Sequence, residues 1–183
     1  PADRRAADEL QKHLALITGA TLPIVADDRP APDHAIMVGL GRLEGSLDAA
    51  SLGPEGFVIR TRGRQIFIAG PTPRGTLYGC SAFLESLGVR WFTPKVTFTP
   101  RQPSLSVPPT DLADRPAFEY REPFIFEAFD KDWAARNRVN GHRPNLDDST
   151  GGKVGYAQFV HTLDTFIPPT LVDTHPEYFP LID

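Results

Sequence analysis

The segment PRGTLYGCSAFLESLGVRWF, residues Pro73–Phe92, predicts a helix that is followed directly by a strand. Thr72 in front of it is a favourable helix N-cap, and Pro73 suits the first helical position because its fixed φ matches the helix. One face of this helix is apolar at helical spacing: Leu77, Cys80, Leu84 and Leu87. Gly88 tolerates the left-handed conformation that ends a helix, and Val89–Phe92 is then extended. The segment therefore predicts a helix packed on a sheet, with an aromatic strand behind it.

On the N-terminal side of this segment, the chain alternates between helical and strand patterns. Asp3–Ile17 carries apolar residues on one helical face and ends at Gly19. The clearest hairpin spans Gly56–Gly70, where GFVIRT and QIFIAG are joined by a tight glycine-containing turn. Shorter strands are predicted at Leu22–Val25 and Ala35–Val38, and short strands or extended pieces at Lys95–Thr99 and Leu105–Val107. The order of elements predicts an α+β fold, with helices packed on a small mixed β-sheet.

The composition is that of a globular protein and excludes some classes of partner. The 183 residues are 40% hydrophobic and 23% charged, and a net charge of −4 does not favour nucleic acid or an anionic membrane surface. No apolar run approaches the roughly 20 residues of a membrane-spanning helix, so no membrane span is predicted. The single cysteine, Cys80, lies on an apolar helix face, which favours a buried thiol over a nucleophile. No signal peptide is visible in the chain.

Charge and proline content divide the chain near residue 110. Residues 1–110 carry twelve Lys and Arg against ten Asp and Glu, whereas residues 111–183 carry seven against thirteen. Arg101–Pro116 contains four prolines and few apolar residues, which is typical of a linker. We therefore predict an N-terminal α+β domain at 1–110 and a second part at 111–183.

The pattern after the linker changes to strand, helix and loop. Ala117–Phe126 is apolar and aromatic like a strand, and Phe129–Val139 has the pattern of a helix capped by Asp130. Asn140–Tyr156 is polar and rich in glycine, the kind of long loop that often carries function. This order is how a (β/α) barrel begins, so residues 111–183 are predicted to hold the linker and the first β/α units of a truncated (β/α)8 barrel.

Arg121, inside the strand predicted at Ala117–Phe126, is the main candidate for a binding residue. A charge in so apolar a segment must be paired or must face water, because burial of a lone charge costs several kcal/mol. Two alternatives stay open. Arg121 forms a buried ion pair with Glu119, Glu122 or Glu127, or its guanidinium grips the hydroxyl groups or a carboxylate of a sugar.

Other polar and aromatic residues give weaker signals. Tyr156 is a candidate platform for stacking on a sugar ring, whereas Trp133 suits the buried side of its predicted helix. The adjacent carboxylates Asp147 and Asp148 are interpreted as solvated loop charges. The five histidines are scattered. His161 and Asp164 could place two ligands on one helical turn, but a third ligand at a fixed spacing is missing, so no metal site is predicted. The sequence has no nucleophile or cofactor motif, so no catalytic residue and no cofactor are predicted.

Three segments resemble an uncharacterised bacterial family of glycosidase-like proteins: RGTLYGCSAFLESLGVRWFTP, RPAFEYREPFIFEAFDKDWAARNRVNG and HPEYF. That family pairs a small α/β domain with a large (β/α) barrel. Its layout is similar to the α-glucuronidases of glycoside hydrolase family 67 and the β-hexosaminidases of family 20. The resemblance implies that a strand ahead of the first helix is missing, and that the catalytic carboxylates lie further along the barrel.

The resemblance also implies which residues bind substrate. Arg121 matches the first-strand arginine that holds sugar hydroxyls, with Glu122, Asn140 and His161 around the same mouth of the barrel. The expected ligand is an oligo- or polysaccharide, with uronic acid or N-acetylhexosamine units as candidates.

The function expected from the resemblance is that of the N-terminal portion of a glycoside hydrolase-like protein, located in the periplasm or secreted. The parent protein would hydrolyse O-glycosyl bonds, and this chain would supply an accessory domain and the barrel start without the catalytic carboxylates. The alternative is a non-catalytic carbohydrate-binding or scaffolding module.

Overall fold

The computed structural model describes residues 2–26, 28, 30–41, 45, 47–122, 129–156 and 162–180. Its strands are β1 (Ala35–Val38), β2 (Phe57–Arg62), β3 (Gln65–Ala69), β4 (Arg90–Thr93), β5 (Val96–Phe98) and β6 (Asp111–Asp114). The α-helices are α1 (Ala2–Thr18), α2 (Ala49–Leu52), α3 (Pro73–Ser86), α4 (Lys131–Arg136) and α5 (Leu163–Phe166). The 3-10 turns are η3 (Asp148–Thr150), η4 (Pro169–Asp173) and η5 (Pro176–Tyr178).

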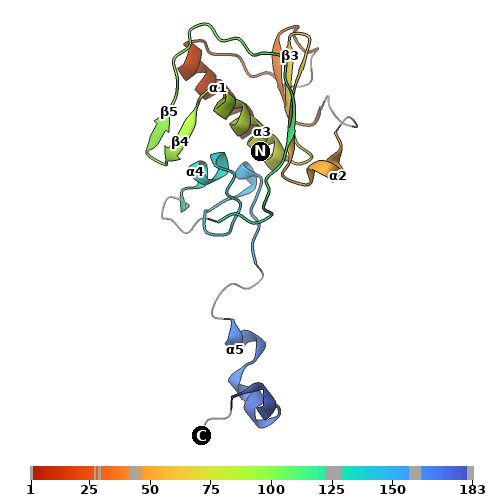
Figure 1. Ribbon diagram of the computed structural model, residues 1–183, viewed down its shortest axis with the longest axis vertical. Helices are drawn as coiled ribbons and strands as arrows, with labels where there is room; N and C mark the ends of the chain where they lie inside the picture. Colours follow the sequence, from red (N-terminus) through yellow and green to blue (C-terminus); the bar gives the residue numbers. More distant parts are fainter. Residues whose placement is uncertain are drawn as a thin grey trace.

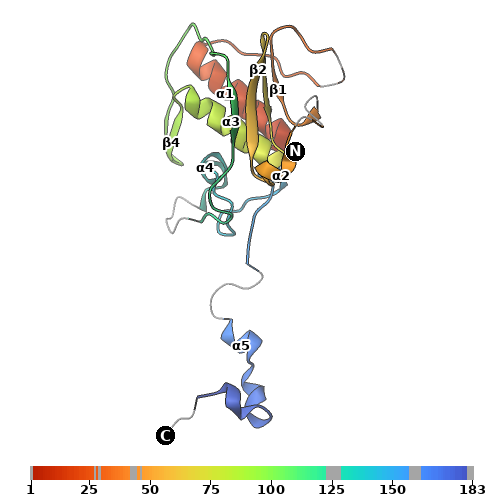
Figure 2. The same cartoon turned by 45° about the vertical axis from the view of Figure 1, so that its right-hand side comes forward.

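A mixed sheet of four strands forms the centre of the fold, in the order β1-β3-β2-β6. β1 runs parallel to β3, whereas β2 is antiparallel to both β3 and β6. α1 and α3 lie side by side against one face of this sheet (Figures 1 and 2). A smaller apolar cluster, which includes Leu52, Val58 and Phe67, covers the other face. The hairpin strands are therefore covered on both faces.

The helix and strand signals of Pro73–Phe92 are confirmed. α3 begins at Pro73, and the hydroxyl of Thr72 accepts a hydrogen bond from the backbone N–H of Gly75 at 3.3 Å. Gly88 adopts a φ of 97°, which ends the helix, and β4 follows. The structure also confirms the helix predicted at Asp3–Ile17, which is α1. It confirms the hairpin, formed by β2 and β3, and the short strands β1 and β5.

Predictions for the irregular segments are wrong in two places. Leu22–Val25 is coil instead of a strand, and Leu105–Val107, predicted as a short strand or an extended piece, forms no strand. The linker predicted for Arg101–Pro116 contains β6, which pairs antiparallel with β2. The aspartates of β6 suit the exposed edge of the sheet, where Arg60 Nε donates to a carboxylate oxygen of Asp111 at 2.8 Å. The sheet therefore continues past residue 110.

The chain after Pro116 packs beside α1, α3 and β4 through the short helix α4 (Figure 1). Asp130 caps α4 by accepting a hydrogen bond from the backbone N–H of Trp133 at 2.7 Å, and Trp133 is buried, as predicted. Residues 117–122 form no strand, so the strand predicted at Ala117–Phe126 is wrong in its described part, and 123–128 lie outside the described residues. The start of a (β/α) barrel stays a prediction.

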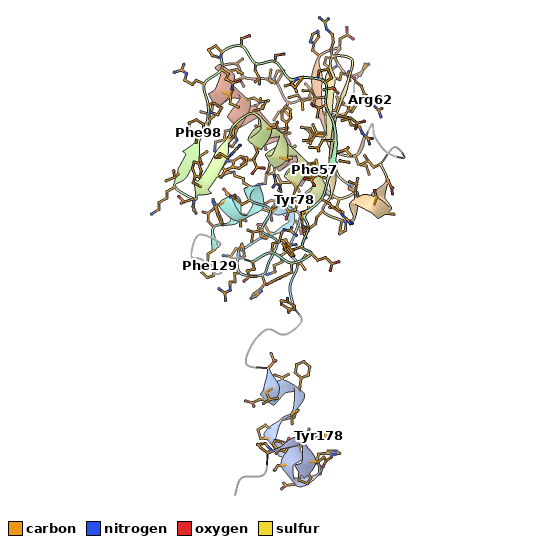
Figure 3. All side chains as sticks on the ribbon, in the orientation of Figure 1. Phe57, Arg62, Tyr78, Phe98, Phe129 and Tyr178 are labelled. Carbon is orange, nitrogen blue, oxygen red and sulfur yellow. The ribbon has the colours of Figure 1, made fainter. Side chains whose placement is uncertain are left out.

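The last described segment, 162–180, consists of α5, η4 and η5. It lies apart from the sheet and its helices in both views (Figures 1 and 2). Figure 3 shows the same separation for two labelled tyrosines, with Tyr78 inside the α+β part and Tyr178 far from it.

The start of α3 depends on a backbone contact that only glycine permits. A Cβ on Gly75 would overlap the carbonyl oxygen of Gly56, and backbone atoms cannot swing away. We expect Gly75→Ala to lower the free energy of unfolding by about 1–3 kcal/mol, measured by urea denaturation. Gly155→Ala is the matched control, because a Cβ there would meet the Cβ of His142 at an ordinary 3.7 Å. Equal stability of the two variants would contradict the close approach.

Candidate functional site

A buried carboxylate, Glu55, joins the α+β part to the chain beyond Pro116. Its Oε1 accepts hydrogen bonds from Nη1 of Arg74 and from Nδ2 of Asn140, both at 2.8 Å. Its Oε2 lies 2.8 Å from Nη2 of Arg121. We call Glu55, Arg74, Arg121 and Asn140 the Glu55 cluster. Because a carboxylate that is only 8% exposed is stable only when it is paired and hydrogen-bonded, these side chains fix one another's positions.

Arg74 connects the cluster to a loop far along the chain. It lies in the first turn of α3, beside the segment that carries Glu55 into β2. Its Nε donates to the carbonyl of Gly151 at 2.9 Å. One guanidinium therefore holds three segments together: the loop before β2, the start of α3 and the loop after η3.

Arg121, the main candidate from the sequence, has each guanidinium nitrogen in contact with the protein. Nε donates to the carbonyl of Arg138 at 2.6 Å, and Nη1 donates to the carbonyl of Phe118. Nη2 contacts Glu55 and also the hydroxyl of Tyr78, at 3.4 Å. The ion-pair alternative is therefore realised, but with a carboxylate distant in sequence instead of a neighbouring one. A role of Arg121 in holding a sugar stays a prediction.

Tyr78 and Asn140 complete the surroundings of Arg121. Burial, followed by the negative charge of Glu55, raises the pKa of Tyr78 to about 12, so its hydroxyl stays protonated. Asn140 is fully buried, and its Oδ1 accepts a hydrogen bond from the backbone N–H of Arg121 at 2.8 Å. Its Nδ2 donates to the carbonyl of Glu119 at 2.7 Å as well as to Glu55. The structure thus brings together two residues that the sequence placed in one site, Arg121 and Asn140.

Glu122 is adjacent to Arg121 but belongs to a second group, the Glu122 cluster, formed by Tyr120, Glu122, His142 and Arg143. Oε2 of Glu122 accepts hydrogen bonds from the hydroxyl of Tyr120 and from the backbone N–H of His142, the latter at 2.8 Å. Nδ1 of His142 lies 3.0 Å from the same oxygen. Nε of Arg143 lies 2.8 Å from Oε1, although this buried oxygen accepts no hydrogen bond of good geometry from a described residue.

Two tyrosines lie at the edge of the Glu122 cluster. Burial, together with the hydrogen bond to Glu122, raises the pKa of Tyr120 to about 12. The ring centroid of Tyr156 lies 4.8 Å from that of Tyr120, and Tyr156 is 57% exposed. Tyr156 is therefore more exposed than Trp133, which is buried. His161 and Glu127, which were also considered from the sequence, lie outside the described residues.

A third set of contacts holds α4 against α1 and β4. Arg136 pairs with both carboxylate oxygens of Glu9, at 2.7 and 3.0 Å. The indole N–H of Trp133 donates to the carbonyl of Trp91 at 3.0 Å, and the indole N–H of Trp91 donates to Nε2 of His13 at 3.3 Å. Nδ1 of His13 lies 2.9 Å from the carbonyl of Glu9, so the neutral ring with its proton on Nδ1 satisfies both contacts. Burial lowers the pKa of His13.

Several properties bound the possible chemistry. A cavity of about 530 Å³ lies between α1, β1 and the segment around 22–32, but none of the residues of the two clusters line it. Within the described ranges, no group of three or more His, Cys, Asp or Glu could hold a metal ion. A search of the helices in those ranges finds none long and apolar enough to cross a membrane. Cys80 is buried as predicted, and burial raises its pKa, which makes the thiol a poor nucleophile.

Five residues of these clusters were not among the candidates from the sequence: Glu55, Arg74, Tyr120, His142 and Arg143. Glu55 lies in the loop sequence GPEG, where an acidic side chain is normally solvated. Arg121 in its apolar segment requires a carboxylate partner, and this requirement is the one signal that could have pointed to Glu55. It does not indicate where in the sequence the partner lies. His142 lies two residues after Asn140 in the glycine-rich loop, and the tertiary fold, not a sequence pattern, places it against Glu122.

The fold and the comparisons with known proteins define the class: a glycoside hydrolase-associated accessory domain. Residues 1–99 match the model of glycosyl hydrolase family 20, domain 2. Residues 91–183 match a domain of unknown function, DUF4838. Each match covers more than half of the chain, so the chain belongs to both families. The two matched ranges overlap at residues 91–99, in the hairpin β4–β5. No curated protein matches the chain.

We expect removal of the Glu55 charge to destabilise the fold strongly. Glu55→Gln keeps the shape of the side chain but leaves two guanidinium groups without their shared charge. We expect a loss of about 3 kcal/mol in the free energy of unfolding, measured by urea denaturation. The control is Glu177→Gln, whose side chain is 62% exposed, for which we expect a change within about 0.5 kcal/mol. Wild-type stability in Glu55→Gln would show that the ion pairs contribute little.

The lowered pKa of His13 predicts how stability depends on pH. A protonated His13 would direct an N–H at the indole N–H of Trp91, so the folded chain keeps the ring neutral, whereas the unfolded chain takes up the proton near the ordinary value of 6.5. The free energy of unfolding therefore falls as the pH drops below about 6.5. We expect His13→Gln to show a shallower decrease in urea titrations at successive pH values, and His34→Gln, at an exposed position, to keep the wild-type decrease. The same decrease in His13→Gln as in the wild type would contradict this assignment.

Proposed function

We propose that this chain is the N-terminal portion of a glycoside hydrolase-like, carbohydrate-active protein. The observation that carries the proposal is the match of residues 1–99 to domain 2 of glycosyl hydrolase family 20. A small mixed sheet with α1 and α3 on one face is consistent with such a domain. In this proposal the parent protein hydrolyses O-glycosyl bonds, and this chain supplies the accessory domain and part of the approach to substrate.

Within the chain we propose two parts. Residues 1–110 form the accessory domain, and 111–183 hold a linker and the first β/α units of a (β/α) barrel, in a layout like that of the family 67 α-glucuronidases and family 20 β-hexosaminidases. Because β6 pairs with β2, its residues Asp111–Asp114 go with the first part, and the linker follows them. We further propose a secreted or periplasmic location, where a protein acting on oligo- or polysaccharides meets its substrate.

We assign no catalytic carboxylate to this chain. Glycosidases of this type place two carboxyl groups about 5–9.5 Å apart across the scissile bond. The carboxylates of Glu55 and Glu122 are instead engaged with arginines of the same chain. In this proposal the catalytic pair therefore belongs to other residues of the parent protein.

A second candidate is a non-catalytic carbohydrate-binding or scaffolding module. The observation that favours it is the extent of contact between the two parts. The Glu55 cluster, the bond from Arg74 to Gly151 and the pair of Arg136 with Glu9 hold the chain after Pro116 firmly against the α+β part. An interface that fixes the two parts relative to each other also suits a module that binds a carbohydrate without hydrolysing it.

The test of the proposal has two measurements. Calorimetric titration of the chain with N-acetylglucosamine, glucuronic acid, glucose and their oligosaccharides measures binding, and we expect dissociation constants of about 1 mM. Release of 4-nitrophenol from aryl glycosides of the same sugars measures hydrolysis, and we expect it from the protein encoded by the whole reading frame. Binding without hydrolysis by that protein would favour the non-catalytic module. Failure of every sugar to bind the chain would contradict the proposal.

A further inference from the structure

Asn140 and Gly141 form an Asn-Gly pair, a sequence with a reaction of its own. The backbone nitrogen of the glycine can attack Cγ of the asparagine side chain, which closes a succinimide ring and releases ammonia. Water then opens the ring and leaves aspartate or isoaspartate in place of asparagine. Glycine favours the ring closure because it has no side chain to hinder the attack and its backbone adopts many conformations. The pair therefore carries the chemistry of deamidation, and the fold decides when that chemistry can occur.

The fold engages each group that the reaction needs. The side chain of Asn140 is fully buried, and its Oδ1 accepts a hydrogen bond from the backbone N–H of Arg121 at 2.8 Å. Its Nδ2 donates to Glu55 at 2.8 Å and to the carbonyl of Glu119 at 2.7 Å. The N–H of Gly141, which must lose its proton to attack, donates to the carbonyl of Arg121 at 3.2 Å. Ring closure therefore requires these bonds to break and water to enter.

The product of deamidation does not fit the contacts that Asn140 makes. In an aspartate at position 140, a carboxylate oxygen would replace Nδ2 and face Glu55 and the carbonyl of Glu119, which are both acceptors. Two acceptors form no hydrogen bond, and two carboxylates at this distance repel each other. Isoaspartate adds a carbon atom to the main chain, which would displace the carbonyl that accepts the N–H of Val154 at 2.7 Å. Either product therefore disfavours closure of the junction.

We propose that Asn140 and Gly141 form a modification site that makes opening of this junction permanent. In the closed fold the Glu55 cluster protects the amide of Asn140. When the segments 119–121 and 140–141 separate, the succinimide forms, and the aspartate or isoaspartate left by hydrolysis prevents the cluster from forming again. The α+β part and the chain after Pro116 are then uncoupled, because the released ammonia is not recovered. This inference does not depend on the proposed carbohydrate function, and its test measures no sugar.

Peptide mapping by mass spectrometry, after incubation in mildly alkaline buffer, measures the deamidation of each asparagine. We expect Asn140 to react at least about a hundredfold more slowly in the folded chain than in the chain unfolded by guanidinium chloride, because only the open junction reacts. Asn145 is the matched control, since it is exposed in the same loop but is followed by the bulky Leu146. We expect little deamidation of Asn145 in either state. Equal rates at Asn140 in the folded and unfolded chains would overturn the proposed protection.

Glu55→Gln tests whether opening of the junction controls the reaction. This variant removes the charge that holds the cluster together, so we expect Asn140 to deamidate at least about tenfold faster than in the wild type. The comparison is made under conditions in which circular dichroism shows the variant to be folded. Glu177→Gln is the control, because its side chain is 62% exposed, and we expect the wild-type rate. An unchanged rate in Glu55→Gln would overturn the link between the junction and the modification.

Asn140→Asp reproduces one product directly. We expect its midpoint of urea unfolding to fall by about 1 M, and Asn145→Asp to keep the wild-type midpoint. The double variant Asn140→Asp with Glu55→Gln removes one of the two facing carboxylates, so we expect it to unfold at a higher urea concentration than Asn140→Asp alone. A purely steric defect would show no such recovery. Wild-type stability of Asn140→Asp, or a double variant no more stable than that single variant, would overturn the proposed effect of the modification.

Discussion

Glu55 carries a negative charge into a region where Arg74, Arg121 and Asn140 converge, each with a nitrogen 2.8 Å from its carboxylate. A carboxylate so far from water requires these partners, because desolvation without them would cost several kcal/mol. Nε of each arginine donates to a backbone carbonyl, and Nη1 of Arg121 does so as well, so these bonds help to orient both guanidinium groups toward Glu55. The loop before β2, the start of α3 and the loops that follow α4 therefore cannot shift independently. The Glu55 carboxylate thus ties these segments of the α+β part to the later chain.

Fixing Arg121 also determines what lies next to it. Arg121 and Glu122 are neighbours in the chain, yet their side chains belong to separate clusters. Asn140 fixes the start of the loop that carries His142, because its side chain bonds to Glu55 while its backbone bonds to Arg121 and Val154. The loop that carries His142 is thereby placed against Glu122. The same backbone contacts that stabilise the fold thus position the surface at which Tyr120 and Tyr156 meet.

The sequence was informative where a signal is local. Thr72 and Gly88 mark both ends of α3, and the alternating apolar pattern marks the hairpin, because these features act within a few residues. β6 has the sequence DLAD and is surrounded by prolines, so its place in the sheet follows from pairing with β2 and not from its own propensity. The partner of Arg121 was equally hidden. An apolar context predicts that an arginine needs a carboxylate, but only the tertiary fold selects Glu55 over the acidic residues nearby in the chain.

Trp91 lies in the residues that both family models match, and it bonds to elements on either side of that overlap. Its indole N–H donates to His13 on α1, and its carbonyl accepts the indole N–H of Trp133 on α4. Arg136 on α4 forms a bidentate ion pair with Glu9 on α1, which stabilises the same interface. The residues matched by the two family models therefore pack against each other without a break, although the charge content suggests a division of the chain near residue 110. If the accessory domain helps to present a sugar, a joint made of buried indoles and paired charges suits that task, because it holds the domain at one fixed orientation to the residues that follow.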